Sequence, residues 1–118
     1  MMAAWGRIAL WAVQIVTALA FLAAGFAKLT AAPAMVQMFA TIGVGQWLRY
    51  LTGTIEVTSS ILLLFPFTAT LAALVLVGTM LGAVLAHLTI LDSSPVAPIV
   101  LMILCGAIGW GRRGASAV

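Results

Sequence analysis

The chain has 118 residues, of which 65% are hydrophobic and only 6% are charged, whereas soluble domains are roughly 25% charged. So few charges do not cover the surface that a domain of this size leaves in water. The formal net charge of +3 comes from scattered basic residues that form no patch. The composition excludes a soluble enzyme, a nucleic-acid-binding domain and a disordered chain, and it indicates an integral protein of the lipid bilayer.

The first apolar segment covers residues 8–27 and contains no charged residue. At about 1.5 Å per residue it is roughly 30 Å long, which matches one hydrocarbon core. A secretory signal peptide would also begin with a basic residue such as Arg7 followed by an apolar run. This run is longer than a signal-peptide core and Lys28 follows it directly, so we expect a first membrane span that is retained.

Three more apolar segments follow, and the second of the four carries Arg49 and Glu56. The last is short, about 24 Å if helical, and Ser94 and Pro95 mark its start because they suit the first positions of a helix. The sequence shows no linker and no internal repeat, which predicts a single domain over residues 1–118. We expect the four spans at about residues 8–27, 46–65, 67–91 and 95–110.

A short helix is expected between the first two spans, opening at Pro33 and ending at Gly43 and Gly45. Its apolar residues gather on one side, which favours a helix lying in the membrane interface over a plain loop, although the loop stays open. The predicted fold is therefore all-α: an integral membrane four-helix bundle with a short interfacial helix between its first two spans. The apolar residues of the short helix are Met35, Val36, Met38, Phe39 and Ile42.

The basic residues also predict an orientation. An even number of spans places both termini on one side, where Arg7, Arg112 and Arg113 outnumber Lys28 and Arg49 on the other. By the positive-inside rule we expect both termini in the cytoplasm. The membrane itself is expected to be a bacterial cytoplasmic (inner) membrane.

Polar residues recur at helical spacing within three of the spans, and an ionisable group in a span usually faces other helices or a cavity. The simplest fold therefore points all three stripes inward. The stripes are Gln14, Thr17, Phe21, Ala24 and Lys28 in the first span; Arg49, Thr52, Glu56 and Ser59 or Ser60 in the second; and Thr79, Met80, Ala83 and His87 in the third.

Glu56 is the strongest candidate for a functional residue because it lies near the middle of its span. Its partner is Arg49 on the same helix, His87 from the third span, or Lys28. These four residues form a candidate intramembrane polar cluster, which serves either as a structural network or as a site for ligand binding or proton transfer.

Structural roles without a function in binding or catalysis also explain several of these residues. His87 near a helix end is often structural, and a lysine such as Lys28 at the end of a span often snorkels to the interface. One His, one Cys and two acids lack the spacing of a metal site, so we expect no metal. The single cysteine, Cys105, excludes an internal disulfide and is expected to be a packing residue. Gly78 and Gly82 form a GxxxG motif that serves packing within the bundle or a homodimer.

The chain resembles the DoxX-like family of small four-span membrane proteins over roughly residues 8–111. The resemblance rests on Gly25-Phe26-Ala27-Lys28-Leu29, on Phe39 with Ile42-Gly43, on the stretch from Tyr50 to Glu56, on Leu62-Leu63-Leu64 with Pro66, and on Met80, Ala83, Ala86 and His87.

The resemblance implies the four-span fold and makes Lys28, Glu56 and His87 shared polar positions, but it implies no particular reaction. Relatives include a subunit associated with thiosulfate:quinone oxidoreduction and membrane partners of oxidative-stress proteins. More distant relatives are assembly chaperones for eukaryotic membrane receptors.

Three functions follow as hypotheses. The first is an accessory or partner-binding subunit whose polar site holds a small apolar ligand, since no catalytic motif and no cofactor signature is evident. The second is a membrane component of a quinone-linked oxidoreductase, with Glu56 and His87 handling protons and a quinone as the bound cofactor. The third is a small proton-coupled transporter. It is the weakest, because small multidrug-resistance transporters carry a carboxylate in the first span, where this chain has only Gln14.

Overall fold

The computed structural model describes residues 4–116, which form five helices and, within that range, no strand. The all-helical prediction is confirmed, and the second helix is the short one expected between the first two spans. The helices are α1 (Ala4–Leu29), α2 (Pro33–Ile42), α3 (Trp47–Leu62), α4 (Pro66–Thr89) and α5 (Val96–Ser116).

Proline and glycine set the boundaries of α2 and the start of α4. Pro33 and Pro66 are the first residues of α2 and α4, where a missing N–H leaves no hydrogen bond unmade. Gly43 ends α2 in the left-handed conformation, at φ 86°, and its N–H donates to the carbonyl of Phe39. This is the αL termination that glycine permits without steric cost.

The helices differ in length from the predicted spans, most clearly at the ends of the second and fourth. The second shortens from 46–65 to the 16 residues of α3, because Leu63–Phe65 form the turn that Pro66 requires. The fourth was predicted to end at Trp110, but α5 continues through Arg112 to Ser116. Among the described residues three helices are long and apolar enough to cross a membrane: α1, α4 and the Val96–Gly114 part of α5.

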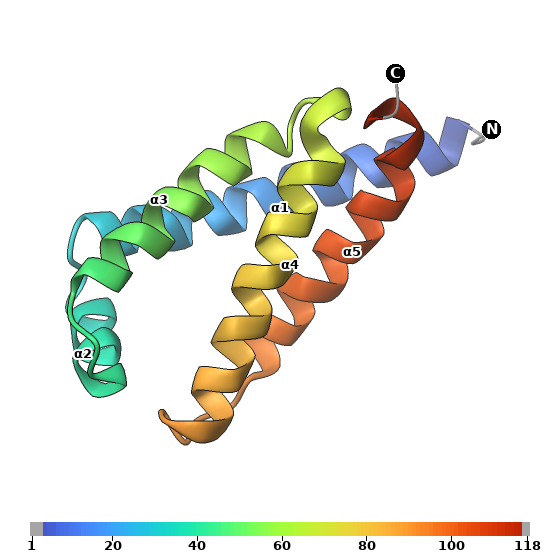
Figure 1. The fold of residues 1–118 in the computed structure, drawn as a ribbon. Coiled ribbons are helices and arrows are strands. Elements are labelled where there is room, and N and C mark those ends of the chain that lie inside the picture. Colours follow the sequence, from blue (N-terminus) through green and yellow to red (C-terminus); the bar gives the residue numbers. More distant parts are fainter. Residues whose placement is uncertain (1–3, 117–118) are drawn as a thin grey trace.

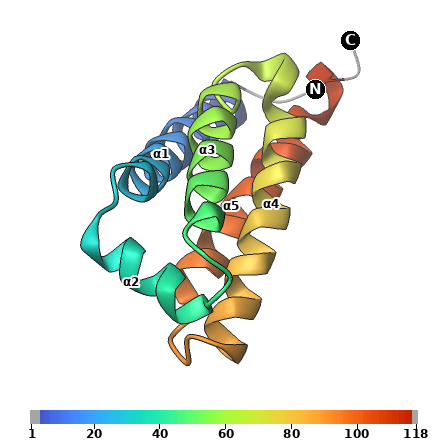
Figure 2. The same cartoon turned by 60° about the vertical axis from the view of Figure 1, so that its left-hand side comes forward.

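The helices pack as two pairs, α1 along α3 and α4 along α5. The pairs converge where α1 begins and α5 ends, and they diverge toward the opposite end of the molecule (Figure 1). The closed end holds the apolar core, in which Phe21, Leu63 and Ile108 are fully buried. At the other end α2 runs beneath the ends of α1 and α3 (Figure 2).

The outward surface of the long helices is apolar, as expected of surface in contact with lipid. Phe67 on α4 is 67% exposed and Ile103 on α5 is 64% exposed. Other large exposed apolar side chains are Ile8, Val16, Leu19, Phe26, Leu71, Leu74, Leu85, Leu88 and Val96. These observations support a helical membrane protein whose polar groups are turned inward.

Candidate functional site

The polar site begins with the close approach of α1 and α3 at two glycines. A Cβ on Gly25 would lie 2.8 Å from Val57 Cγ2 and 2.9 Å from the carbonyl oxygen of Gly53. A Cβ on Gly53 would lie 3.0 Å from the Cβ of Lys28. Any side chain at either position would push the helices apart, so both positions require glycine. No residue pattern considered in the sequence predicted this contact between Gly25 and Gly53.

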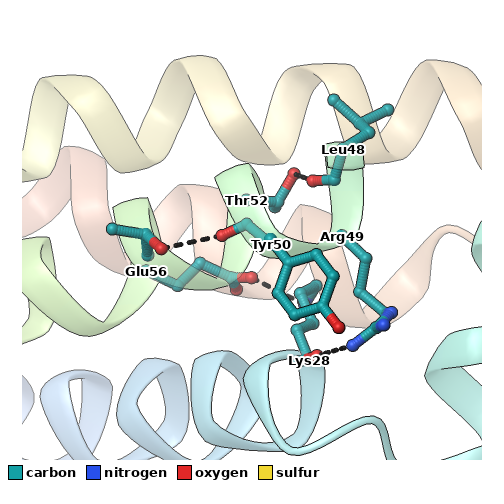
Figure 3. Close-up of polar contacts among 7 residues, drawn as sticks. Lys28, Leu48, Arg49, Tyr50, Thr52 and Glu56 are labelled. Atoms are coloured by element: carbon teal, nitrogen blue, oxygen red, sulfur yellow. Dashed lines mark hydrogen bonds and ion pairs between the residues drawn. The ribbon is translucent and has the colours of Figure 1, made fainter. Parts of the chain in front are cut away.

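Lys28 and Glu56 follow these glycines by one turn on their own helices and form an ion pair between α1 and α3. The Nζ of Lys28 lies 2.6 Å from Oε1 of Glu56, and the two side chains are 13% and 1% exposed (Figure 3). Lys28 therefore points inward rather than snorkelling. Of the three partners considered for Glu56, the structure places Lys28 beside it.

Arg49 performs a different task from the one expected. Its guanidinium donates to the backbone carbonyl of Lys28, at the end of α1, and Nε donates to Oε1 of Gln46 at 2.7 Å. Gln46 in turn donates from Nε2 to the carbonyl of Val36 on α2. Arg49 is buried, stacks on the Tyr50 ring at 4.3 Å and ties together α1, α2 and α3. It is a junction residue beside the ion pair.

His87 lies near the end of α4 and is half-buried. Its Nδ1 is 2.6 Å from the hydroxyl of Ser93 in the α4–α5 connection. It makes no ion pair with Glu56 among the described residues. Its place in the site comes instead from a cavity that both side chains line.

A cavity of about 450 Å³ occupies the region where the helix pairs diverge. Its wall is mainly apolar and includes Met35, Met38 and Phe39 from α2, Ile55 from α3 and Met80 from α4. The apolar side of α2, predicted to lie in the membrane interface, thus faces this cavity. Its polar lining side chains among the described residues are Lys28, Thr52, Glu56, Thr79 and His87.

Gly78 and Gly82 also line the cavity and are exposed. A Cβ on either glycine would have nothing within 4 Å, so they make no close helix contact within the described chain. Of the two roles considered for this GxxxG motif, packing inside the bundle is wrong. Because these exposed glycines belong to its wall, the cavity opens along this flank of α4.

A second polar cluster lies at the closed end of the molecule. Gln14 is fully buried, donates from Nε2 to the Leu63 carbonyl at 2.7 Å, and accepts at Oε1 from Nε of Arg112 at 2.7 Å. Arg112 also lies over the Trp11 ring. The inward position predicted for Gln14 is confirmed. Arg112, which was expected only to set the topology, also donates to this buried side chain.

The chain belongs to the DoxX-like family, whose sequence model matches residues 12–108. The family resemblance is thereby confirmed, and with it the assignment to a family of membrane proteins. No curated protein and no solved structure gives a significant match.

Proposed function

We propose that this DoxX-like chain is an accessory membrane subunit that binds a partner protein and holds a small apolar ligand in the cavity beside Lys28 and Glu56. The observation that carries the proposal is a 450 Å³ apolar cavity with a buried ion pair in its wall. Ligand pockets are mostly apolar, hold a few well-placed polar groups and have volumes of roughly 300–1,000 Å³.

The ion pair supports a binding role more than a structural one. A buried pair is often no more stabilising than apolar residues of the same volume, because both charges lose their hydration. Packing alone therefore gives little reason for Lys28 and Glu56 to face an open cavity within the bilayer. Orientation of a bound ligand would explain why the two charged side chains face the cavity. Ionisable groups inside a membrane commonly mark ligand-binding or proton-transfer sites.

The proposed setting is a bacterial cytoplasmic membrane that α3 crosses beside α1, α4 and α5 in a four-helix bundle, with both termini in the cytoplasm. The contacts at the two ends of α3 support a crossing. Arg49 donates to the carbonyl of Lys28 at the end of α1, and the carbonyl of Leu63, directly after α3, accepts from Gln14 in the first half of α1. The exposed Gly78 and Gly82 leave one flank of α4 free for a partner protein or a second copy of the chain.

A second candidate function is a membrane component of a quinone-linked oxidoreductase. It is favoured by one observation, that Glu56 and His87, two groups able to exchange protons, line the same cavity. A quinone would then be the occupant, and the electrons would come from a cofactor of the partner protein.

Native mass spectrometry of the chain purified from its own membranes into nanodiscs tests the leading proposal. We expect a retained partner protein or a bound apolar molecule, and weaker retention of that molecule in Gly82→Leu, which adds a side chain at the open flank of the cavity. Gly106→Leu is the matched control, because Gly106 is also exposed and free of close contacts but does not line the cavity. A wild-type chain that carries neither partner nor small molecule contradicts the proposal.

A further inference from the structure

The wall of the cavity that we propose as a ligand site carries no net charge. Lys28 and Glu56 are its charged lining residues among those described, and they neutralise each other at 2.6 Å. Whether the shared proton resides on Nζ or on the carboxylate, the pair has no net charge. A charged ligand would therefore enter the bilayer interior without a counter-ion, which costs several kcal/mol.

The polar groups in the wall are mostly acceptors. The hydroxyl of Thr52 donates to the carbonyl of Leu48 at 2.7 Å, and that of Thr79 donates to the carbonyl of Val75 at 2.9 Å. A hydroxyl has one proton to donate, so each threonine has only oxygen lone pairs left for a ligand. The Glu56 carboxylate, 99% buried, also presents acceptor sites, and apart from the Lys28 ammonium its Oε1 has no hydrogen-bond partner among the described residues.

The donors in the wall are fewer. Lys28 has three N–H groups, one of which points to Glu56, and His87 has one ring nitrogen engaged with Ser93. Arg49, the next cation, is occupied by the Lys28 carbonyl and by Gln46. A ligand that fits this wall has an apolar body and a neutral polar group that donates one hydrogen bond and accepts another.

We infer that the cavity selects an uncharged, hydroxyl-bearing lipophile, whose hydroxyl donates to the Glu56 carboxylate and accepts from the Lys28 ammonium. This inference rests on the proposed ligand-binding function and names the chemical class of the ligand. A hydroxyl serves both members of the pair, whereas a ketone satisfies only the lysine and an alkane satisfies neither. The exposed flank at Gly78 and Gly82 lets such a molecule enter from the bilayer.

The test uses the full chain in lipid nanodiscs and five radiolabelled probes of equal chain length: dodecanol, dodecanone, dodecane, dodecanoate and dodecyltrimethylammonium. Retention on empty nanodiscs is subtracted for each probe. We expect dodecanol to bind most tightly. In Lys28→Met/Glu56→Leu, which keeps an apolar pair of similar volume, we expect dodecanol to bind about tenfold more weakly, as loss of a hydrogen bond to a charged group predicts. Dodecane should bind this variant as it binds the wild type.

Two further variants keep the test decisive. Glu56→Gln keeps the shape of the side chain but removes the charge that accepts the ligand's hydroxyl proton. It is expected to weaken dodecanol binding while dodecane binding stays unchanged, even if the double variant fails to fold. Gly82→Leu adds a side chain at the open flank of the cavity and is expected to weaken the binding of every probe. If dodecanone, dodecane or a charged probe binds as tightly as dodecanol, the hydroxyl inference is overturned while the cavity function stands. If Gly82→Leu leaves all binding unchanged, the cavity is not the ligand site and the proposed function fails with it.

Discussion

Lys28 is the cation beside Glu56, and removing it leaves a carboxylate that is 1% exposed without its partner. Breaking a buried pair in this way typically costs about 3–5 kcal/mol, because the remaining charge stays desolvated. We expect Lys28→Met to lower the free energy of unfolding by about that amount. Removing both charges in Lys28→Met/Glu56→Leu should restore most of it. Unfolding in mixed detergent micelles, followed by circular dichroism, measures both variants.

Thr54→Val is a suitable control, because Thr54 is exposed and bonds only to a carbonyl of its own helix. We expect it to change the free energy of unfolding by less than about 0.5 kcal/mol. If Lys28→Met/Glu56→Leu is no more stable than Lys28→Met alone, the loss of stability does not come from an unpaired Glu56 carboxylate, and the account of the ion pair is wrong.

The partner of Glu56 illustrates what residue spacing predicts and what it does not. Helical periodicity placed Lys28, Glu56 and His87 on inward faces, and the structure brings all three to one cavity. Spacing alone left three partners open, because the choice depends on the distance between α1 and α3. That distance is set by Gly25 and Gly53, which allow the close contact. The spacing within one helix does not show that these two glycines face each other.

At the scale of helices, the contact between α1 and α3 depends on the absence of side chains at these two glycines. In Gly25→Ala the new Cβ would meet Val57 Cγ2 at 2.8 Å and the backbone oxygen of Gly53 at 2.9 Å. The helices must separate, and overpacking of this kind costs about 1–3 kcal/mol. We expect a lower melting temperature and a weaker Lys28–Glu56 pair, measured by thermal unfolding in the same micelles.

Gly106→Ala is the matched control, because a Cβ at Gly106 meets nothing within 4 Å and alanine favours the helix by up to about 1 kcal/mol. It should be neutral or stabilising. Equal destabilisation by the two substitutions would show that the close α1–α3 contact does not govern stability.

Sequence patterns predicted the existence of every helix. They also predicted both ends of α2, because Pro33 and Gly43 set these ends through their own local conformations. The fourth span was predicted to end at about Trp110, whereas helix α5 continues through Gly111 to Ser116. The continuation places Arg112 beside Gln14, a contact between residues 98 positions apart in the sequence. Such a contact depends on how α1 and α5 converge, which periodicity within one helix does not encode.

For the whole molecule, the central question is whether α3 crosses the membrane. At 16 residues it is about 24 Å long, shorter than a typical hydrocarbon core. Its contacts nevertheless extend along α1 from the carbonyl of Lys28 back to Gln14, a distance of about 21 Å at helical rise. Since α1 is long and apolar enough to span, we predict that α3 traverses most of the same layer and that local thinning of the bilayer accommodates the rest.

This geometry predicts where two engineered thiols will lie. Ala34 on α2 and Gly114 on α5 are both exposed, and α3, α4 and α5 lie between them. Three crossings place the two positions on opposite sides of the membrane, whereas two crossings, with α3 outside the bilayer, place them on the same side. In a Cys105→Ala background, we expect a membrane-impermeant maleimide added to intact cells to label Ala34→Cys and not Gly114→Cys. Both should react after permeabilisation, which controls for thiol reactivity. Labelling of both variants in intact cells, or of neither, would mean that α3 does not cross, and labelling of Gly114→Cys alone would place the termini outside.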